Sequence, residues 1–240
     1  MLFQYTNLWR IFVHPRRLRL FLAQRQVCEI IVEDESEQAT SLEKLLSHIP
    51  ARLPFVDRVE FILDFSQLHY LIIPWHQGVT TPHERDLYAI AFHQQQQQGQ
   101  VSPPMRVAFT DFAYGKNGLA ALMSQESFDT YRALALRCRL RFIGCRSLFD
   151  FLWRSDKKNA RTCGLFACIG EMQSSFVLRF ENQWHSAFTL HLPAADTQAQ
   201  LAIANRLAGI PRLDWHVMNT CSGDYRPQYF GLSTPAEEKV

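Results

Sequence analysis

The chain has 240 residues, 47% of them hydrophobic, and its 25 basic and 23 acidic residues leave a net charge of +2. This length and hydrophobic content support a substantial buried core, arranged as one compact protein of two lobes. A net charge this small gives no argument for binding to nucleic acid or to an anionic membrane.

No apolar run approaches the roughly 20 residues that are needed to cross a bilayer. Residues 1–7 lack the basic-then-apolar order of a secretion signal, so we expect a cytoplasmic protein. The six cysteines form no C-x-x-C pair, and we expect them to be reduced and to pack as small apolar residues.

Short apolar runs with turn residues between them predict strands in the first half of the chain, at residues 8–13, 18–22, 26–32, 59–65, 68–74 and 105–109. Three helices are predicted here. The first runs from a cap at Thr40 or Ser41 to residue 49, the second starts within 80–84 and continues to 93, and the third covers 124–138.

The second half continues with strands at 118–123 and 140–144, three strands within 163–190, and a strand at 213–218. Ser147 can cap a short helix, and a helix over 194–208 is ended by Gly209. Serine, glycine, proline and charged residues predict a mobile tail over 221–240.

Three strands, a helix and a strand occur twice in this order, over 9–63 and again over 164–218. This duplicated βββαβ order resembles the actin and hexokinase superfamily. The resemblance implies an actin-like (ribonuclease H-like) α/β fold of two lobes, the first spanning 1–160 with a small inserted subdomain near 76–123, and the second a reduced lobe over 161–220.

The turn after the first strand of the second repeat carries Ile169-Gly170, where actin-like ATPases hold a phosphate. The acidic residue that normally precedes Ile-Gly is replaced by Cys168. Gly170, Glu171 and Ser174 are therefore the candidate residues of a degenerate phosphate turn.

The other nucleotide motifs of such ATPases are also weak in this sequence. The first turn reads His14-Pro15-Arg16-Arg17, in which proline removes an N–H donor, although the two arginines could still meet phosphate as charges. Only residues 221–224, with one glycine, could replace the adenine loop. We therefore expect no catalytic residues, no nucleotide hydrolysis and no bound cofactor.

Three segments make the chain similar to the PilM family of type IV pilus assembly and to the cytoplasmic domain of the type II secretion protein GspL. They are 68–74, which ends in Ile-Ile-Pro before a tryptophan, 124–146, a helix followed by Leu-Arg-Phe-Ile-Gly, and 165–178, with the second phosphate turn. The resemblance implies a non-catalytic cytoplasmic scaffold, peripheral at the inner membrane, that binds a bitopic membrane partner and an assembly ATPase.

The helix over 84–93, with Tyr88 and Phe92, and the following strand, with Val107 and Phe109, resemble the part of PilM that lines a peptide groove. An ordinary core helix is the alternative interpretation. The basic run Arg132, Arg137, Arg139, Arg141 and Arg146 is compatible with a solvated helix face, with nucleic acid, or with an acidic partner. Arg137 and Arg141 are the candidates for partner contact.

Other functions have weaker support in the residues. No two histidines or cysteines have the spacing of a known metal-ligand cluster, and the G-x-S-x-G motif of a serine hydrolase is absent. Cys168 could be a nucleophile or a packing residue. An ATP-binding small-molecule kinase or ATPase of the same superfamily is the alternative to the scaffold, and a basic nucleic-acid-binding module is a third hypothesis.

Overall fold

The computed structural model describes residues 6–50, 55–97, 103–156, 163–170, 173–192, 196–210, 213–221, 225 and 227–230. The chain divides into two compact units. The first unit comprises 1–69, 94–108 and 121–148, and the second comprises 70–93, 109–120 and 149–240.

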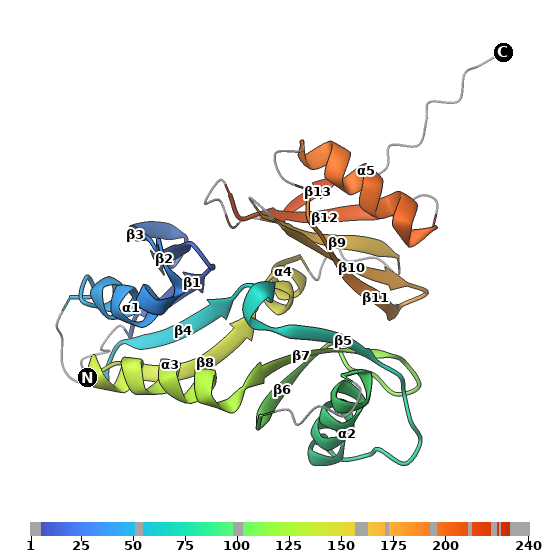
Figure 1. Cartoon of the computed structure of the whole chain (residues 1–240), viewed down its shortest axis with the longest axis horizontal. Helices are drawn as coiled ribbons and strands as arrows, with labels where there is room; N and C mark the ends of the chain where they lie inside the picture. The colour runs from blue at the N-terminus through green and yellow to red at the C-terminus, as the bar shows by residue number, and fades with distance from the viewer. Residues whose placement is uncertain are drawn as a thin grey trace, which may run out of the picture. The chain divides into compact units, whose positions relative to one another are not determined.

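A five-stranded sheet of order β3-β2-β1-β4-β8 forms the centre of the first unit (Figure 1). Its strands are β1 (Leu8–Val13), β2 (Arg17–Leu22), β3 (Arg25–Ile31), β4 (Arg58–Leu63) and β8 (Arg141–Ser147). β1, β2 and β3 form an antiparallel meander, whereas β4 runs parallel to both β1 and β8.

Two helices cover one face of this sheet, α1 (Gln38–Leu46) and α3 (Gln125–Arg137). Alternate residues of β1, Trp9, Ile11 and Val13, point to this face and are buried against both helices. α3 begins at Ser124, whose hydroxyl accepts a hydrogen bond from the Ser127 N–H. The spacing of apolar residues, at alternate positions in the strands and along one face of each helix, thus explains the layered core.

The start of α1 differs from the sequence prediction of a cap at Thr40 or Ser41. A 3₁₀ turn, η1 (Glu35–Glu37), leads directly into α1, and Glu37 is the N-cap residue without a side-chain hydrogen bond. Both predicted caps therefore lie inside the helix. A second 3₁₀ turn, η2 (Phe65–Gln67), follows β4.

A second five-stranded sheet, of order β11-β10-β9-β12-β13, forms the centre of the second unit. Its strands are β9 (Gly164–Ile169), β10 (Ser174–Phe180), β11 (Gln183–Leu190), β12 (Asp214–Asn219) and β13 (Gln228–Phe230). The short strand β13 pairs antiparallel with β12, in a segment for which the sequence predicted only a mobile tail.

One helix, α5 (Thr197–Ala208), packs on one face of the second sheet (Figure 1). Leu201 and Ala204 of α5 are fully buried against residues of β9 and β10. Gly209 ends the helix with a φ of 67°, the left-handed conformation that glycine adopts without strain. This confirms the predicted helix end.

An aromatic cluster occupies the opposite face of the second sheet and was not predicted from the sequence. Trp153 of α4 (Leu148–Asp156) contacts Phe166 and Trp184, with ring centroids 5.5 and 5.3 Å apart. The buried His216 ring stacks on Phe166 at 4.5 Å. Large rings thus supply the core of this face.

The remaining elements are β5 (His69–Ile73), α2 (Pro82–Gln96), β6 (Met105–Thr110) and β7 (Gly118–Ser124). The three strands form a sheet of order β5-β7-β6, and the boundary between the two units runs through them. The duplicated βββαβ order is confirmed, as β1-β2-β3-α1-β4 and β9-β10-β11-α5-β12. None of the described helices is both long and apolar enough to span a bilayer.

Candidate functional site

A groove of about 260 Å³ lies in the first unit between strands β6 and β8. One wall consists of residues 143–147 of β8, and the other consists of residues 106–108 of β6. The floor is apolar and includes Leu63, Leu68, Ala121, Met123 and Phe128. This volume is just below the usual range for pockets that hold small-molecule ligands.

Both walls of the groove are edge strands. β8 is the last strand of its five-stranded sheet, and β6 is the last strand of its three-stranded sheet. Within the described residues, neither strand has a further strand on its outer side. An edge strand carries backbone N–H and C=O groups that can pair with an added chain. The groove therefore offers backbone pairing on two sides.

A β-bulge interrupts β8 at the groove. Val59 of β4 is opposite Phe142, but the next residue, Glu60, is opposite Gly144, so Ile143 is the extra residue. Ile143 is 46% exposed, and Gly144 has a φ of 149°, a conformation that other residues rarely adopt. Bulges redirect side chains and occur frequently beside functional sites.

Arg106 lies over an aromatic ring of the groove. Its guanidinium carbon is 3.9 Å from the centroid of Phe128, which packs edge-on against Phe142 at 5.3 Å. A cation in this position is attracted by the face of the ring. The stacking therefore restrains an exposed arginine at one wall of the groove.

The second arginine of the groove, Arg146, belongs to a charge network on β8, β4 and β1. Its guanidinium is 2.8 Å from one carboxylate oxygen of Glu60, and Arg10 is 3.3 Å from the other oxygen. Glu60 is only 4% exposed, so a buried carboxylate is held between two arginines. The network fixes Arg146 against the sheet.

Cys145 is the groove residue with a perturbed pKa. Burial raises the pKa of its thiol to about 12, while nearby Arg106 lowers it and Glu60 raises it. A thiol with this pKa stays protonated at neutral pH and is a poor nucleophile. The groove chemistry is therefore that of recognition by apolar and cationic groups.

The predicted partner-binding residues fall in several places. Val107 lines the groove, and Arg141 is exposed on β8, two residues before the bulge. Arg137, at the end of α3, is 2.5 Å from Glu43 of α1, so its charge is already paired. Tyr88, Phe92 and Phe109 lie in the second unit.

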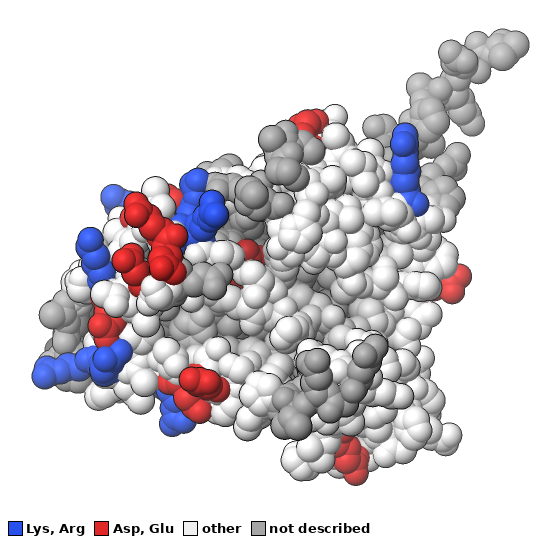
Figure 2. Space-filling model, in the orientation of Figure 1, with Lys and Arg blue, Asp and Glu red and all other residues white. Residues whose placement is uncertain are grey.

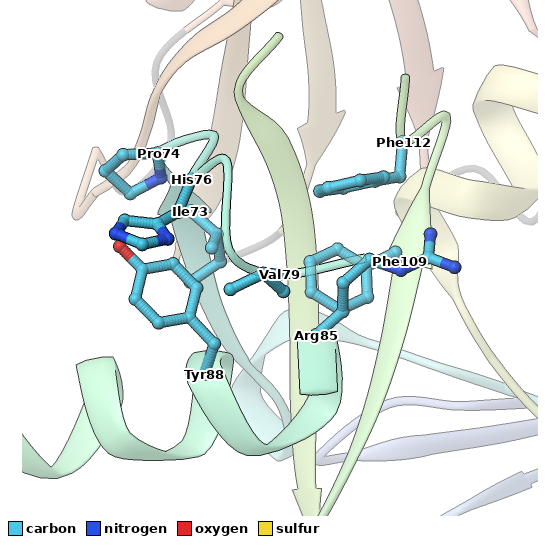
Figure 3. A pocket seen from close by; sticks show the side chains of 8 residues that line it. All are labelled: Ile73, Pro74, His76, Val79, Arg85, Tyr88, Phe109 and Phe112. Carbon is cyan, nitrogen blue, oxygen red and sulfur yellow. The ribbon is translucent and has the colours of Figure 1, made fainter. Parts of the chain in front are cut away.

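Tyr88 and Phe109 line a second pocket, between α2, β6 and the loop after β5 (Figure 3). Its Tyr88 and His76 rings lie 5.9 Å apart on one side, and Arg85 is over Phe112 at 4.8 Å. The pocket leaves only about 10 Å³ of space, no more than one water molecule needs. Side chains already fill it, so the groove between β6 and β8 is the better candidate.

The turn at Gly170 is closed by hydrogen bonds within the protein. The Gly170 N–H donates to the Ser174 hydroxyl at 3.2 Å, and this hydroxyl donates to the Gln200 amide oxygen at 2.6 Å. Ser174 is 1% exposed. A Cβ on Gly170 would lie 2.3 Å from the Gln173 carbonyl oxygen, so the tight turn itself requires glycine. Glu171 lies outside the described residues.

The turn between β1 and β2 is also internally bonded. The His14 N–H donates to the Arg17 carbonyl at 3.0 Å, and the His14 ring is 3.0 Å from the Asp64 carboxylate. That carboxylate also accepts the Phe65 N–H at 2.7 Å. Arg17 lies 3.5 Å from Glu29 of β3. The His14–Asp64 pair, which joins residues 50 apart, was not predicted from the sequence.

Charge on the visible face is mixed. Figure 2 shows acidic and basic side chains interspersed over the region of β3, α1 and α3, while most of the remaining described surface in this view is uncharged. Among the described residues, no three His, Cys, Asp or Glu side chains form a group that could hold a metal ion.

Solved structures share the fold of this chain at low sequence identity. The cytoplasmic domain of EpsL, an inner-membrane component of the Vibrio cholerae type II secretion system, has 9% identity and a TM-score of 0.56, over 95% of this chain and 87% of that one. The PilM–PilN type IV pilus biogenesis complex has 13% sequence identity and a TM-score of 0.53, and the match covers 89% of this chain and 81% of that one.

A third similar structure is a Bacteroides thetaiotaomicron protein of unknown function with an actin-like ATPase fold. It has 11% sequence identity and a TM-score of 0.54, and the match covers 89% of this chain and 81% of that one. No protein-family model matches this sequence, and no curated protein does. The comparisons establish an actin-like fold, and the predicted resemblance to PilM and GspL is confirmed at the level of that fold.

Proposed function

We propose that this chain is a non-catalytic adaptor in the inner-membrane platform of a type II secretion, type IV pilus or related system. Its groove between β6 and β8 holds a short extended segment from the cytoplasmic part of a bitopic membrane protein. An assembly ATPase is the second expected partner. The observation that carries the proposal is the groove itself, with an edge strand on each side and an apolar floor.

An extended segment suits this groove because both walls present unpaired strand edges. Main-chain hydrogen bonds to an edge supply affinity without a particular sequence, and the floor selects apolar side chains on one face of the segment. Val107 lines the β6 wall and Ile143 lines the β8 wall, so both are available for apolar contact. The fold likeness to the EpsL domain and to PilM in its complex with PilN favours a membrane-platform partner.

The non-catalytic part of the proposal rests on the two turns. Phosphate binding in a glycine-rich turn needs backbone N–H groups that point toward the ligand. The Gly170 N–H instead donates to Ser174, and the His14 N–H donates to Arg17. Both donors would have to break existing bonds to reach a phosphate.

Site-specific photo-crosslinking in the native host tests the proposed function. A benzoylphenylalanine at position 143 places the crosslinker in the groove, and the same residue at position 203, exposed on α5, is the matched control. We expect position 143 to capture the cytoplasmic segment of a single-span membrane protein, identified by mass spectrometry, and position 203 to miss it. Capture of soluble proteins alone at position 143, or equal capture at both positions, would refute the adaptor.

A further inference from the structure

The charges that line the groove between β6 and β8 are of one sign. The lining includes two arginines, Arg106 and Arg146, and no carboxylate. The nearest anion of the network, Glu60, is buried and already lies between Arg10 and Arg146. The described part of the groove therefore has an excess of positive charge.

Arg106 is the cation that remains available to a ligand. Among the residues that the structure describes, no carboxylate pairs with Arg106, and its guanidinium contacts the Phe128 ring. Stacking leaves the edge of the guanidinium, with its N–H donors, open to a planar acceptor. A carboxylate can accept two of these N–H groups at once.

The geometry of an extended chain relates this charge to a sequence pattern. Successive side chains of a strand point to opposite sides, so a segment between β6 and β8 presents alternate residues to the floor. The floor is apolar at Leu63 and Met123, whereas the exposed Arg106 of the β6 wall has its guanidinium over the Phe128 ring. The side chains on one side of the segment thus contact apolar groups, and those on the other side lie near the Arg106 guanidinium.

We propose that the groove recognises an acidic extended peptide, in which apolar residues alternate with glutamate or aspartate and one carboxylate pairs with Arg106. This inference rests on the proposed function, because it specifies the chemistry of the segment that the adaptor holds. Charge complementarity of this kind determines which partner binds and in which register.

Three synthetic octapeptides test the inference. In each, apolar residues (valine and leucine) alternate with one polar residue, which is glutamate in the first peptide, glutamine in the second and lysine in the third. Binding is measured by fluorescence anisotropy at low and high salt. We expect the glutamate peptide to bind about tenfold more tightly than the glutamine peptide at low salt, and the difference to shrink at high salt because ions screen the charge. The lysine peptide is expected to bind most weakly.

Charge exchange at Arg106 assigns the effect to this residue. Arg106→Gln should remove the preference for glutamate, Arg106→Lys should keep part of it, and Arg106→Glu should reverse it in favour of the lysine peptide. Arg132→Gln, an exposed arginine of α3 outside the groove lining, is the matched control and should change nothing.

The outcomes separate this inference from the proposed function. Equal binding of the three peptides, or a glutamate preference that survives Arg106→Gln, overturns the acidic specificity and leaves the adaptor intact. If none of the peptides binds while position 143 still crosslinks a membrane protein, the acidic peptide is also rejected. Loss of both peptide binding and crosslinking rejects the adaptor as well.

Discussion

The guanidinium of Arg179 donates a hydrogen bond of 2.6 Å to the carboxylate of Asp111, which lies 68 residues earlier in the chain. The same guanidinium is within 4.4 Å of the Trp153 ring and 5.0 Å of the Trp184 ring. Arg179 is on β10, and Asp111 directly follows β6. One buried cation therefore ties the end of β6 to the second sheet within the same unit.

Arg179→Ala is expected to lower the free energy of unfolding of the second unit by about 3 kcal/mol, because breaking a buried ion pair leaves the partner charge uncompensated. Its side chain is 6% exposed and that of Asp111 is 28% exposed, so both are largely desolvated. Urea unfolding followed by tryptophan fluorescence measures the change. Arg132→Ala, on the exposed face of α3, is the control, and equal effects of the two variants would contradict a role for the pair.

Mg²⁺-ATP at millimolar concentration is expected to leave the melting temperature unchanged, because the Gly170 N–H and the Ser174 hydroxyl are bonded within the protein. Differential scanning fluorimetry with and without the nucleotide makes the comparison. A ligand that binds the native state raises the melting temperature by mass action, so a rise of several degrees would favour the ATPase alternative.

Gly170→Ala is expected to cost about 1–3 kcal/mol of stability whether or not nucleotide is present, because its Cβ would meet the Gln173 carbonyl oxygen at 2.3 Å. Urea unfolding with and without Mg²⁺-ATP measures this cost. Ser155→Ala, in the last turn of α4, is the control for a small change in an exposed position. If Gly170 were required only for phosphate binding, Gly170→Ala would not lower the stability in the absence of nucleotide.

Stability is expected to fall as the pH rises above about 9, partly because of Cys145 and Tyr131. Burial raises the pKa of the Cys145 thiol from 9.0 to about 12, and burial raises the pKa of Tyr131 well above its ordinary value. The unfolded chain loses these protons first, so between the unfolded and folded pKa values the native state binds more protons and is destabilised by further base.

Urea midpoints at pH 8, 9.5 and 10.5 measure this alkaline loss. Tyr131→Phe keeps the ring contact with Phe61 but removes the ionisable hydroxyl and its hydrogen bond to Gln67, so the variant should be less stable at pH 8 yet lose less stability on going to pH 10.5. An unchanged alkaline slope in both Tyr131→Phe and Cys145→Ala would show that other groups cause it.

The carboxyl of Glu84 is expected to titrate far below its ordinary range. Hydrogen bonds from the Thr81 and Thr80 backbone N–H groups, and then from their hydroxyls, lower its pKa from 4.5 to about 2. The Thr81 hydroxyl in turn accepts the Glu84 N–H at 3.2 Å, which completes a capping box at the start of α2. Because the folded pKa is depressed, this contribution to the start of α2 is present above pH 4.5 and is lost as the pH falls toward 2.

NMR titration of the Glu84 side chain measures this pKa directly. Thr81→Val removes one hydroxyl donor and the acceptor for the Glu84 N–H, so the pKa should rise part of the way toward 4.5. Thr130→Val, in the middle of α3, provides a control in another helix. A Glu84 pKa near 4.5 in the unaltered protein would rule out the capping box in solution.

Local patterns in the sequence predicted most of the elements. A short apolar run predicted β1 with its observed bounds, and the threonine, proline and glutamate near residue 82 predicted the start of α2. The failures are where several elements meet. α1 begins earlier than its best capping residues because η1 already fixes the chain before it.

The groove could be predicted only in part, because its walls come from segments about 40 residues apart. Val107 was predicted through the family resemblance, but Ile143 gave no signal, since a bulge depends on the register of two strands rather than on one segment. Likewise, Gln200 is polar in the sequence, and only folding brings it to the Ser174 hydroxyl.

The bulge at Ile143 also limits what the β8 edge can join. A straight, flat edge would let a second copy of the sheet continue across it, which is how proteins with exposed strands grow into aggregates. Beyond the bulge, the regular edge of β8 is only Gly144–Ser147. We therefore expect the bulge to disfavour edge-to-edge pairing with a whole strand of a second copy, while the short regular stretch remains compatible with the short segment proposed above.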